Sequence, residues 1–259
     1  MMKYLTEKNA LRLIAVLGAI TVLVLLNMNP IPQDLAYHHF ADTKAVLAIP
    51  NMLNVVSNLP FLYIGGLGLY HLLFTKSLHI IEANKPAYIA FFLGAALVGI
   101  GSSYYHLSPN NQTLLWDRLP MTIAFMGLCS VIISEFMSVE IGKSLLIPFL
   151  VLGISSVFYW DYTESHGAGD LRFYAIIQFF PLFAIPIILL SFKAKYQQVS
   201  AYWWLLATYL IAKVFELLDT QTYALLNIIS GHSLKHICAA VGAYILLRSY
   251  QARKTVETS

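Results

Sequence analysis

Two histidines near the C-terminus have a spacing that suits metal binding. His232 and His236 lie four positions apart, so a helix would bring both imidazoles to one face. Two imidazoles at this spacing converge on a metal ion in other helical proteins. The pair therefore predicts two ligands of a metal site, which needs at least one more side chain from elsewhere in the chain.

A third histidine belongs to a separate polar cluster in the middle of the sequence. His106 follows Ser102 by four residues at the end of one apolar segment, and Asp117 lies where the next one begins. Three histidines leave a fourth zinc position for water, which is typical of a catalytic rather than a closed structural site. Zinc lowers the pKa of that water toward ~7, and an aspartate beside it can take or orient the proton. We therefore predict a zinc centre with His106, His232 and His236 as ligands, and with Asp117 and Ser102 beside it.

Each of these residues also has a purely structural interpretation. The histidines would then only hydrogen-bond between helices, which is common in membrane proteins. Ser102 would be a packing serine, or one bonded to its own helix backbone. Asp117 would pair with the adjacent Arg118 or cap the start of its helix.

The composition indicates that lipid is the solvent for much of the chain. Of the 259 residues, 58% are hydrophobic and 11% charged, and the mean hydropathy is +0.68. A soluble domain usually has about a quarter charged residues. The net charge of +3 comes from scattered basic residues, which argues against nucleic-acid binding. The two cysteines lie inside apolar runs and form no disulfide framework.

The apolar segments predict an all-α, polytopic membrane bundle in a single domain. Crossing a ~30 Å hydrocarbon core takes roughly 20 apolar residues. The first segment has basic residues before it, as a signal peptide has, but it is long and no cleavage site follows it, so we expect a retained helix. We expect eight spans, at residues 11–28, 53–74, 87–106, 115–136, 143–160, 172–192, 201–219 and 232–249.

Basic residues in the connections support an even number of spans. With eight spans, most of them fall on the side of the two termini, and the other side receives mainly Lys44 and Arg172. Positive residues favour the cytoplasmic side, so we expect both termini to be cytoplasmic. The three histidines and Asp117 then share one layer near the non-cytoplasmic face.

Further ionisable residues lie within or beside the predicted spans. Lys213, Glu216 and Asp219 are three apart on one face of the segment 201–219. They would form either a polar network that supports the site or a plain ion pair between helices.

The connection 161–172 is expected on the same side as the zinc centre. Its Glu164 and Arg172 would bind a lipid headgroup or cover the cavity, unless they belong to an ordinary solvated loop. Ser103 and Arg118, next in sequence to the predicted site residues, are further candidates for support or substrate contact.

At these residues the sequence resembles the alkaline ceramidase family. That family belongs to a superfamily of seven-helix membrane hydrolases that also includes the adiponectin-type receptors. The resemblance covers about residues 50–250, so that 1–49 adds an N-terminal helix and loop and 251–259 forms a cytoplasmic tail. The matching strings are Asn54-Val-Val-Ser57-Asn58, Gly99-Ile-Gly101-Ser102 with His106, Leu115-Trp-Asp117-Arg-Leu-Pro-Met121, and His232-x-x-x-His236 with Gly242-Ala-Tyr244.

The resemblance implies a zinc amidase that hydrolyses a lipid amide such as ceramide to a fatty acid and a long-chain amine. Carried over, the three histidines bind zinc and Asp117 is the general base for the water. Ser102 stabilises the oxyanion or orients a neighbour. A membrane lipid is the expected partner, and the sequence indicates no nucleic acid and no protein partner.

One motif of the family is not reproduced. Eukaryotic members have an acidic calcium site in which a glutamate precedes the asparagine of the first core helix by three residues. Here Asn51 stands at that position, so the resemblance does not extend to Ca²⁺. The sequence looks closer to prokaryotic relatives, and we expect a bacterial plasma membrane.

Two other functions fit the same residues. In a lipid-sensing receptor or transporter, zinc would only hold helices together. In a hydrolase of another bond, such as an ester or acyl-phospholipid, the same centre would act on a different substrate.

Overall fold

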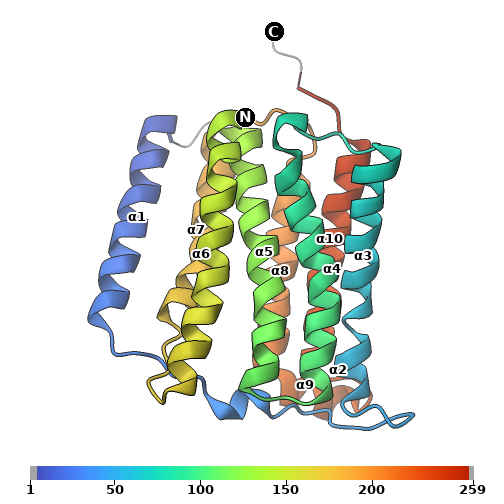
Figure 1. Ribbon diagram of the computed structural model, residues 1–259. Helices are drawn as coiled ribbons and strands as arrows, with labels where there is room; N and C mark the ends of the chain where they lie inside the picture. Colours follow the sequence, from blue (N-terminus) through green and yellow to red (C-terminus); the bar gives the residue numbers. More distant parts are fainter. Residues whose placement is uncertain (1–4, 257–259) are drawn as a thin grey trace.

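The apolar stretches of the chain fold into long helices that run side by side (Figure 1). The computed structural model describes residues 5–256. Within these residues the chain forms α-helices, short 3₁₀ and π segments, and no β-strand. The α-helices are α1 Glu7–Asn27, α2 Met52–Val56, α3 Leu59–Tyr70, α4 Lys85–Leu107, α5 Asn111–Phe136, α6 Val139–Ser165, α7 Arg172–Ser191, α8 Ser200–Leu217, α9 Asp219–Leu226 and α10 Gly231–Ala252.

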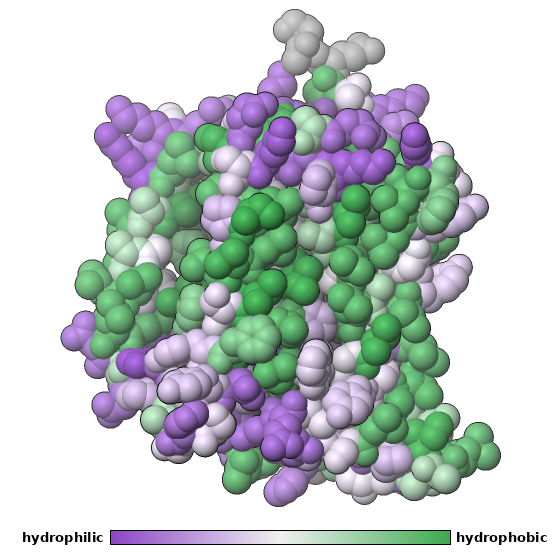
Figure 2. Space-filling model, viewed as in Figure 1, coloured by the Kyte–Doolittle hydropathy of each residue, from purple (hydrophilic) through white to green (hydrophobic). Residues whose placement is uncertain are grey.

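The arrangement is a multi-pass membrane bundle, as expected. Packing is tightest between α4 and its neighbours α3 and α5, between α5 and α6, and between α8 and α10, while α1 lies outside the bundle against α7. Figure 2 shows apolar side chains across the middle of the visible face and hydrophilic ones at both ends. This banding matches a chain whose middle is surrounded by hydrocarbon.

The number of spans depends on how two helices are counted. Within the described residues six segments are long and apolar enough to cross a membrane, or seven if the bent pair α8 and α9 forms one span. The eighth expected span is α10, which has 22 residues and lies alongside the others (Figure 1). It is not among the apolar segments, and its first turns carry His232, Lys235 and His236.

Four expected helices differ in detail from the structure. The expected helix 143–160 is longer at both ends, as α6 Val139–Ser165, so the first residues of the predicted connection 161–172 are helical. The expected helix 115–136 begins earlier, at Asn111, because Asn110 and Thr113 form a reciprocal capping box. The expected helix 53–74 is divided into α2, α3 and a π turn, and α3 starts with Pro60 in its first turn. The expected helix 201–219 ends at Leu217 and turns by 80° into α9. The sequence predicts Asp219 on the same helix as Lys213 and Glu216. This prediction is wrong, because Asp219 belongs to α9.

Both ends of the described chain lie at one end of the bundle, and the three histidines lie at the other. α1 begins and α10 ends at the same end (Figure 1). The last three residues of the predicted tail 251–259 lie outside the described part of the chain. The end of α4 and the starts of α5 and α10 meet at the opposite end, which is the common layer expected for the three histidines.

A buried ion pair fastens the segment after α10 to the bundle. Arg253 and Glu135 are both 1% exposed; Nη1 of Arg253 lies 2.8 Å from Glu135 Oε2, and Nη2 donates to the other oxygen. The hydroxyls of Tyr88 and Tyr202 also donate to this carboxylate, at 2.6 and 2.8 Å. Each oxygen of the Glu135 carboxylate therefore accepts two hydrogen bonds, one from Arg253 and one from a tyrosine. These bonds compensate for the burial of the charge.

We expect Glu135→Gln to lower the stability of the bundle substantially. The substitution leaves Arg253 as an uncompensated buried charge, and breaking a buried pair in this way costs about 3–5 kcal/mol. A thermal unfolding scan in detergent should show a clearly lower unfolding temperature. The matched control is Glu140→Gln at an exposed position of α6, and equal unfolding temperatures for the two variants would contradict the prediction.

Candidate metal centre and its cavity

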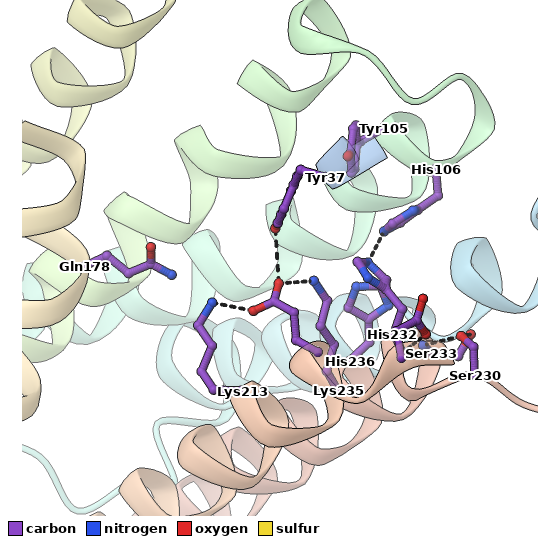
Figure 3. Close-up of polar contacts among 12 residues, drawn as sticks. Tyr37, Tyr105, His106, Gln178, Lys213, Ser230, His232, Ser233, Lys235 and His236 are labelled. Atoms are coloured by element: carbon purple, nitrogen blue, oxygen red, sulfur yellow. Dashed lines mark hydrogen bonds and ion pairs between the residues drawn. The ribbon is translucent and has the colours of Figure 1, made fainter. Parts of the chain in front are cut away.

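The three predicted histidines come together in the structure. His106 at the end of α4 and His232 and His236 at the start of α10 are 1%, 4% and 7% exposed. Their ligand nitrogens all lie within 4.8 Å of one another, and the Nε2 atoms of His106 and His232 are 3.3 Å apart. Figure 3 shows the three rings turned toward one another. This buried three-histidine group can hold a metal ion.

Local backbone contacts fix the start of α10. The Ser230 side chain caps the helix by accepting from the Ser233 N–H at 3.2 Å. Asp219 of α9 accepts from the His232 N–H at 2.7 Å. A Cβ at Gly231 would overlap the carbonyl oxygen of Phe215, so only glycine lets α10 approach α8 this closely. The bend between α8 and α9 and this glycine together hold His232 in place.

The hydrogen bond to His236 orients its ring for ligation. Ser57 Oγ lies 2.8 Å from His236 Nδ1, which leaves Nε2 free to face the other two rings. Histidine ligands of metals are usually held in this way through the second ring nitrogen. Zn–N bonds of about 2.0–2.1 Å at tetrahedral angles place neighbouring nitrogens about 3.3 Å apart. The spacing of the His106 and His232 nitrogens matches that edge, so this pair is compatible with two ligands of a tetrahedral metal ion.

We expect Ser57→Ala to weaken metal binding without removing a ligand. Loss of such a hydrogen-bond partner typically reduces metal affinity about 10–100-fold. Competition with a chelator of known affinity measures the change, and Ser144→Ala, at an exposed position of α6, is the control. An unchanged affinity would show that Ser57 does not orient the ligand.

Asp117 and Ser102 lie next to each other at the same end of the bundle. Both are buried and line the same cavity, and the Ser102 side chain lies close to the Asp117 carboxyl group. A Cβ at Gly101 would overlap the carbonyl oxygen of Trp116, so glycine permits the close approach of α4 and α5 that brings the pair together.

The structural alternatives for Asp117 do not hold. The cap of α5 is Asn110, seven residues earlier in the chain. Among the described ion pairs none joins Asp117 to Arg118. Arg118 Nη2 donates instead to Gln33 Oε1 at 2.6 Å.

A cavity of about 620 Å³ connects these residues. Ser102, Asp117 and His236 line it, together with residues of α7, α8 and the segment before α2. A second cavity of about 150 Å³ continues from it between α4, α5, α7 and α8 and has an almost wholly apolar lining. The two share the lining residues Phe61, Val98, Met121, Gln178, Tyr209 and Ala239.

An ion-pair cluster forms another part of the cavity lining. Lys235 of α10 lies 2.7 Å from Glu216 Oε1, and Lys213 donates to the other oxygen of the same carboxylate. The Tyr37 hydroxyl donates to Glu216 at 3.1 Å, and Figure 3 shows Tyr37, Lys213 and Lys235 near one another. Burial raises the pKa of Tyr37 well above its ordinary value, and the Glu216 carboxylate adds to this, so the phenol stays a donor.

The other predicted residues lie away from the cavity lining. The Ser103 hydroxyl donates to the Val55 carbonyl at 3.0 Å and ties α4 to α2. Glu164 accepts from the Gln33 N–H at 3.0 Å. Arg172 pairs with Asp170 at 2.8 Å and donates to the Leu25 carbonyl at the end of α1. The hydrogen bond from Arg172 lowers the pKa of Asp170 to about 2, so this pair is intact at neutral pH.

Several residues around the site were not singled out from the sequence. Ser57 entered the sequence analysis only as part of a string shared with the family, without a role of its own. Tyr37 and Gln33 lie in a connection without a motif, and Phe40 packs its ring against His106 and His232 at centroid distances of 4.7 and 4.3 Å. Of these residues Lys235 was the most recognisable from the sequence as part of a polar site, because a charged residue at membrane depth is costly and needs a partner.

Comparison with known proteins gives one match. A protein-family model described as Ceramidase matches residues 42–258. No curated protein and no solved structure matches the chain significantly. The matched region begins after α1 and includes all three histidines together with Ser102 and Asp117.

Proposed function

The chain belongs to the ceramidase family, and from this premise we propose that it is an intramembrane zinc-dependent hydrolase that cleaves the amide bond of a lipid such as ceramide. The observation that carries the proposal is the cavity itself. It is lined by Asp117, Ser102 and His236, one member of the buried three-histidine group, and it continues into an apolar extension inside the bundle. An apolar cavity at membrane depth suits the hydrocarbon chain of a lipid and not a polar, water-soluble substrate.

His106, His232 and His236 would hold the metal ion. When bound, zinc supplies Lewis acidity and lowers the pKa of water to about 7. The neutral imidazoles leave the charge of the ion available for this chemistry, and the Ser57 hydrogen bond keeps His236 in its ligating orientation.

Asp117 would handle the proton during hydrolysis. As water attacks the amide carbon, Asp117 takes a proton from it, and the same proton goes to the nitrogen as the C–N bond breaks. The products are a fatty acid and an amine. Ser102, beside Asp117 in the cavity lining, would hold the carboxylate in position or donate to the carbonyl oxygen as negative charge develops there.

The hydrocarbon chain of the lipid would occupy the apolar cavities. Cys129 lines the second cavity and also a third one, of about 300 Å³, beneath α1. We expect Cys129→Phe to reduce kcat/KM for long-chain amides by about 10-fold or more relative to short-chain amides, because the ring blocks the passage. A chain-length series measures this. Cys238→Phe on α10, which lines none of these cavities, should leave the ratio unchanged, and the same profile for both variants would contradict the assignment.

We also propose that the site faces the non-cytoplasmic side of a bacterial plasma membrane. Lys76 and Lys195 lie in connections, and Lys143 near the start of α6, at the end where α1 begins and α10 ends. Basic residues favour the cytoplasm. A cysteine introduced at Lys143 should react only with a reagent that reaches the cytoplasm. Reaction from the other side would reverse the orientation.

Two measurements on the purified protein test the function directly. Elemental analysis should find about one zinc per chain, and the protein should release fatty acid from ceramide or a related lipid amide, in a reaction that a chelator abolishes and added zinc restores. A metal-free protein with full activity, or a zinc protein inactive on every lipid amide but active on esters, would overturn the proposal.

A further inference from the structure

The side chains that line the cavity include three cations close to the predicted reaction site. Arg118 of α5, Lys213 of α8 and Lys235 of α10 all line it. Both lysines bond to the single carboxylate of Glu216. We call the three cations with Glu216 and Tyr37 the cationic wall. The fixed charges of this group are three positive and one negative, and the rest of the cavity lining adds the carboxylates of Asp34 and Asp117.

Arg118 has no carboxylate partner within the described part of the chain. It is 7% exposed, its Nη2 donates to the neutral oxygen of Gln33, and its Nη1 makes no hydrogen bond. The aromatic rings of Trp160 and Tyr174 pack against the guanidinium at 4.2 and 4.9 Å. Cation–π contacts offset part of the cost of burying a charge, but they supply no counter-charge.

A buried cation of this kind calls for an anion. Charges inside a protein are normally paired, because an unpaired one loses its hydration without a compensating interaction. Asp117 is adjacent in sequence and interacts with Arg118 electrostatically, but the two form no ion pair among those described. Tyr37 lies near two of the cations: the charged groups of Arg118 and Lys235 are each 5.9 Å from its ring centre. The cavity therefore offers a cationic side directly beside the residues proposed for catalysis.

We infer that the cationic wall binds an oxyanion, a carboxylate or a phosphate, on the headgroup of the lipid amide, so that Arg118 selects anionic substrates. A guanidinium matches both groups because its fork of N–H donors can bond two oxygens at once. Because Arg118 follows Asp117 directly, a headgroup held there would place its amide next to the general base. That the bound anion belongs to a substrate rests on the proposed function. The binding of the anion itself does not.

Three amphiphiles with the same acyl amide test it: N-dodecanoylglycine, N-dodecanoylphosphoethanolamine and the neutral N-dodecanoylethanolamine. For each, the dissociation constant is measured by the shift in thermal unfolding of the zinc-loaded protein, and kcat/KM by release of dodecanoate. At least one charged probe should bind about tenfold tighter than the neutral one. The comparison between the two charged probes identifies which oxyanion is the better ligand.

Variants of the protein test whether Arg118 causes the preference for charged probes. Arg118→Met should abolish the difference between charged and neutral probes, while Lys44→Met, an exposed cation at the same end of the bundle, should retain it. If Arg118→Met does not fold, Lys213→Met, with a third of its side chain exposed, should reduce the difference. Equal binding of all three probes by the wild-type protein, or a preference that survives the loss of Arg118, would overturn the inference. Tighter binding of a charged probe with no hydrolysis of any would instead refute the proposed function and leave the inference intact.

Discussion

Replacement of His236 by alanine should remove the bound zinc and reduce lipid-amide hydrolysis by about 10³-fold or more. Two imidazoles cannot complete the three-ligand set of a catalytic zinc site, and loss of the ion removes several kcal/mol of transition-state stabilisation. The variant should still fold, because His236 contributes one hydrogen bond, to Ser57, and lies at the cavity rather than in the helix-packing core. Zinc content and turnover are to be measured on the same preparation.

The control for this variant is another histidine of the same bundle. His166 is exposed at the end of α6 and bonds only within its own turn. His166→Ala should keep full zinc content and activity. If His236→Ala keeps its zinc and its turnover, the three histidines are a hydrogen-bonded cluster and the metal centre is refuted.

Replacement of Asp117 by asparagine should reduce turnover by about 10²–10⁴-fold while the zinc content stays the same. This is the usual contribution of a positioned general base, and asparagine cannot accept the proton although it has nearly the same shape. Zinc should remain because Asp117 is not one of the three clustered ligands. A drop in kcat with little change in KM is the expected pattern.

The same variant separates the hydrolase from a receptor or transporter. In a protein that uses zinc only to join α4 to α10, Asp117→Asn would leave ligand binding and stability unchanged and there would be no hydrolysis to lose. Asp34→Asn is the matched control, because Asp34 lines the cavity and caps a short 3₁₀ turn that asparagine also caps well. Full hydrolytic activity in the Asp117 variant would remove it from the mechanism.

Local sequence was sufficient for much of the helical framework. Runs of about 20 apolar residues have few alternatives to a membrane helix, so most spans were correctly located and only their ends moved. Those ends depend on individual caps: Asn110 begins α5 four residues before the apolar run suggests. The break between α2 and α3 and the 80° turn after Leu217 were not predicted, because hydropathy does not distinguish a straight helix from a bent one.

The candidate site divides in the same way. The spacing of His232 and His236 determines that they share a helix face, since four residues make about one turn. By itself the sequence also placed His106, Ser102 and Asp117 in one layer of the bundle, through the count of spans. What it lacked was any measure of distance: His106 and His232 are 126 positions apart, and only the packing of α4 against α5 and of α10 against α8 decides which polar groups meet.

The three histidines were therefore accessible from the sequence, and their environment was not. Ser57 reaches His236 across 179 positions, and the turn into α9 takes Asp219 off the face of Lys213 and Glu216 and sets it against the N-terminus of α10. Arg118 and Asp117 are neighbours in the chain, yet in the fold Arg118 bonds to Gln33 and Asp117 lies beside Ser102. Sequence patterns determine which side chains a helix presents, because helical periodicity is local. The tertiary structure decides what they face, because the contacts between helices join residues that no short-range pattern relates.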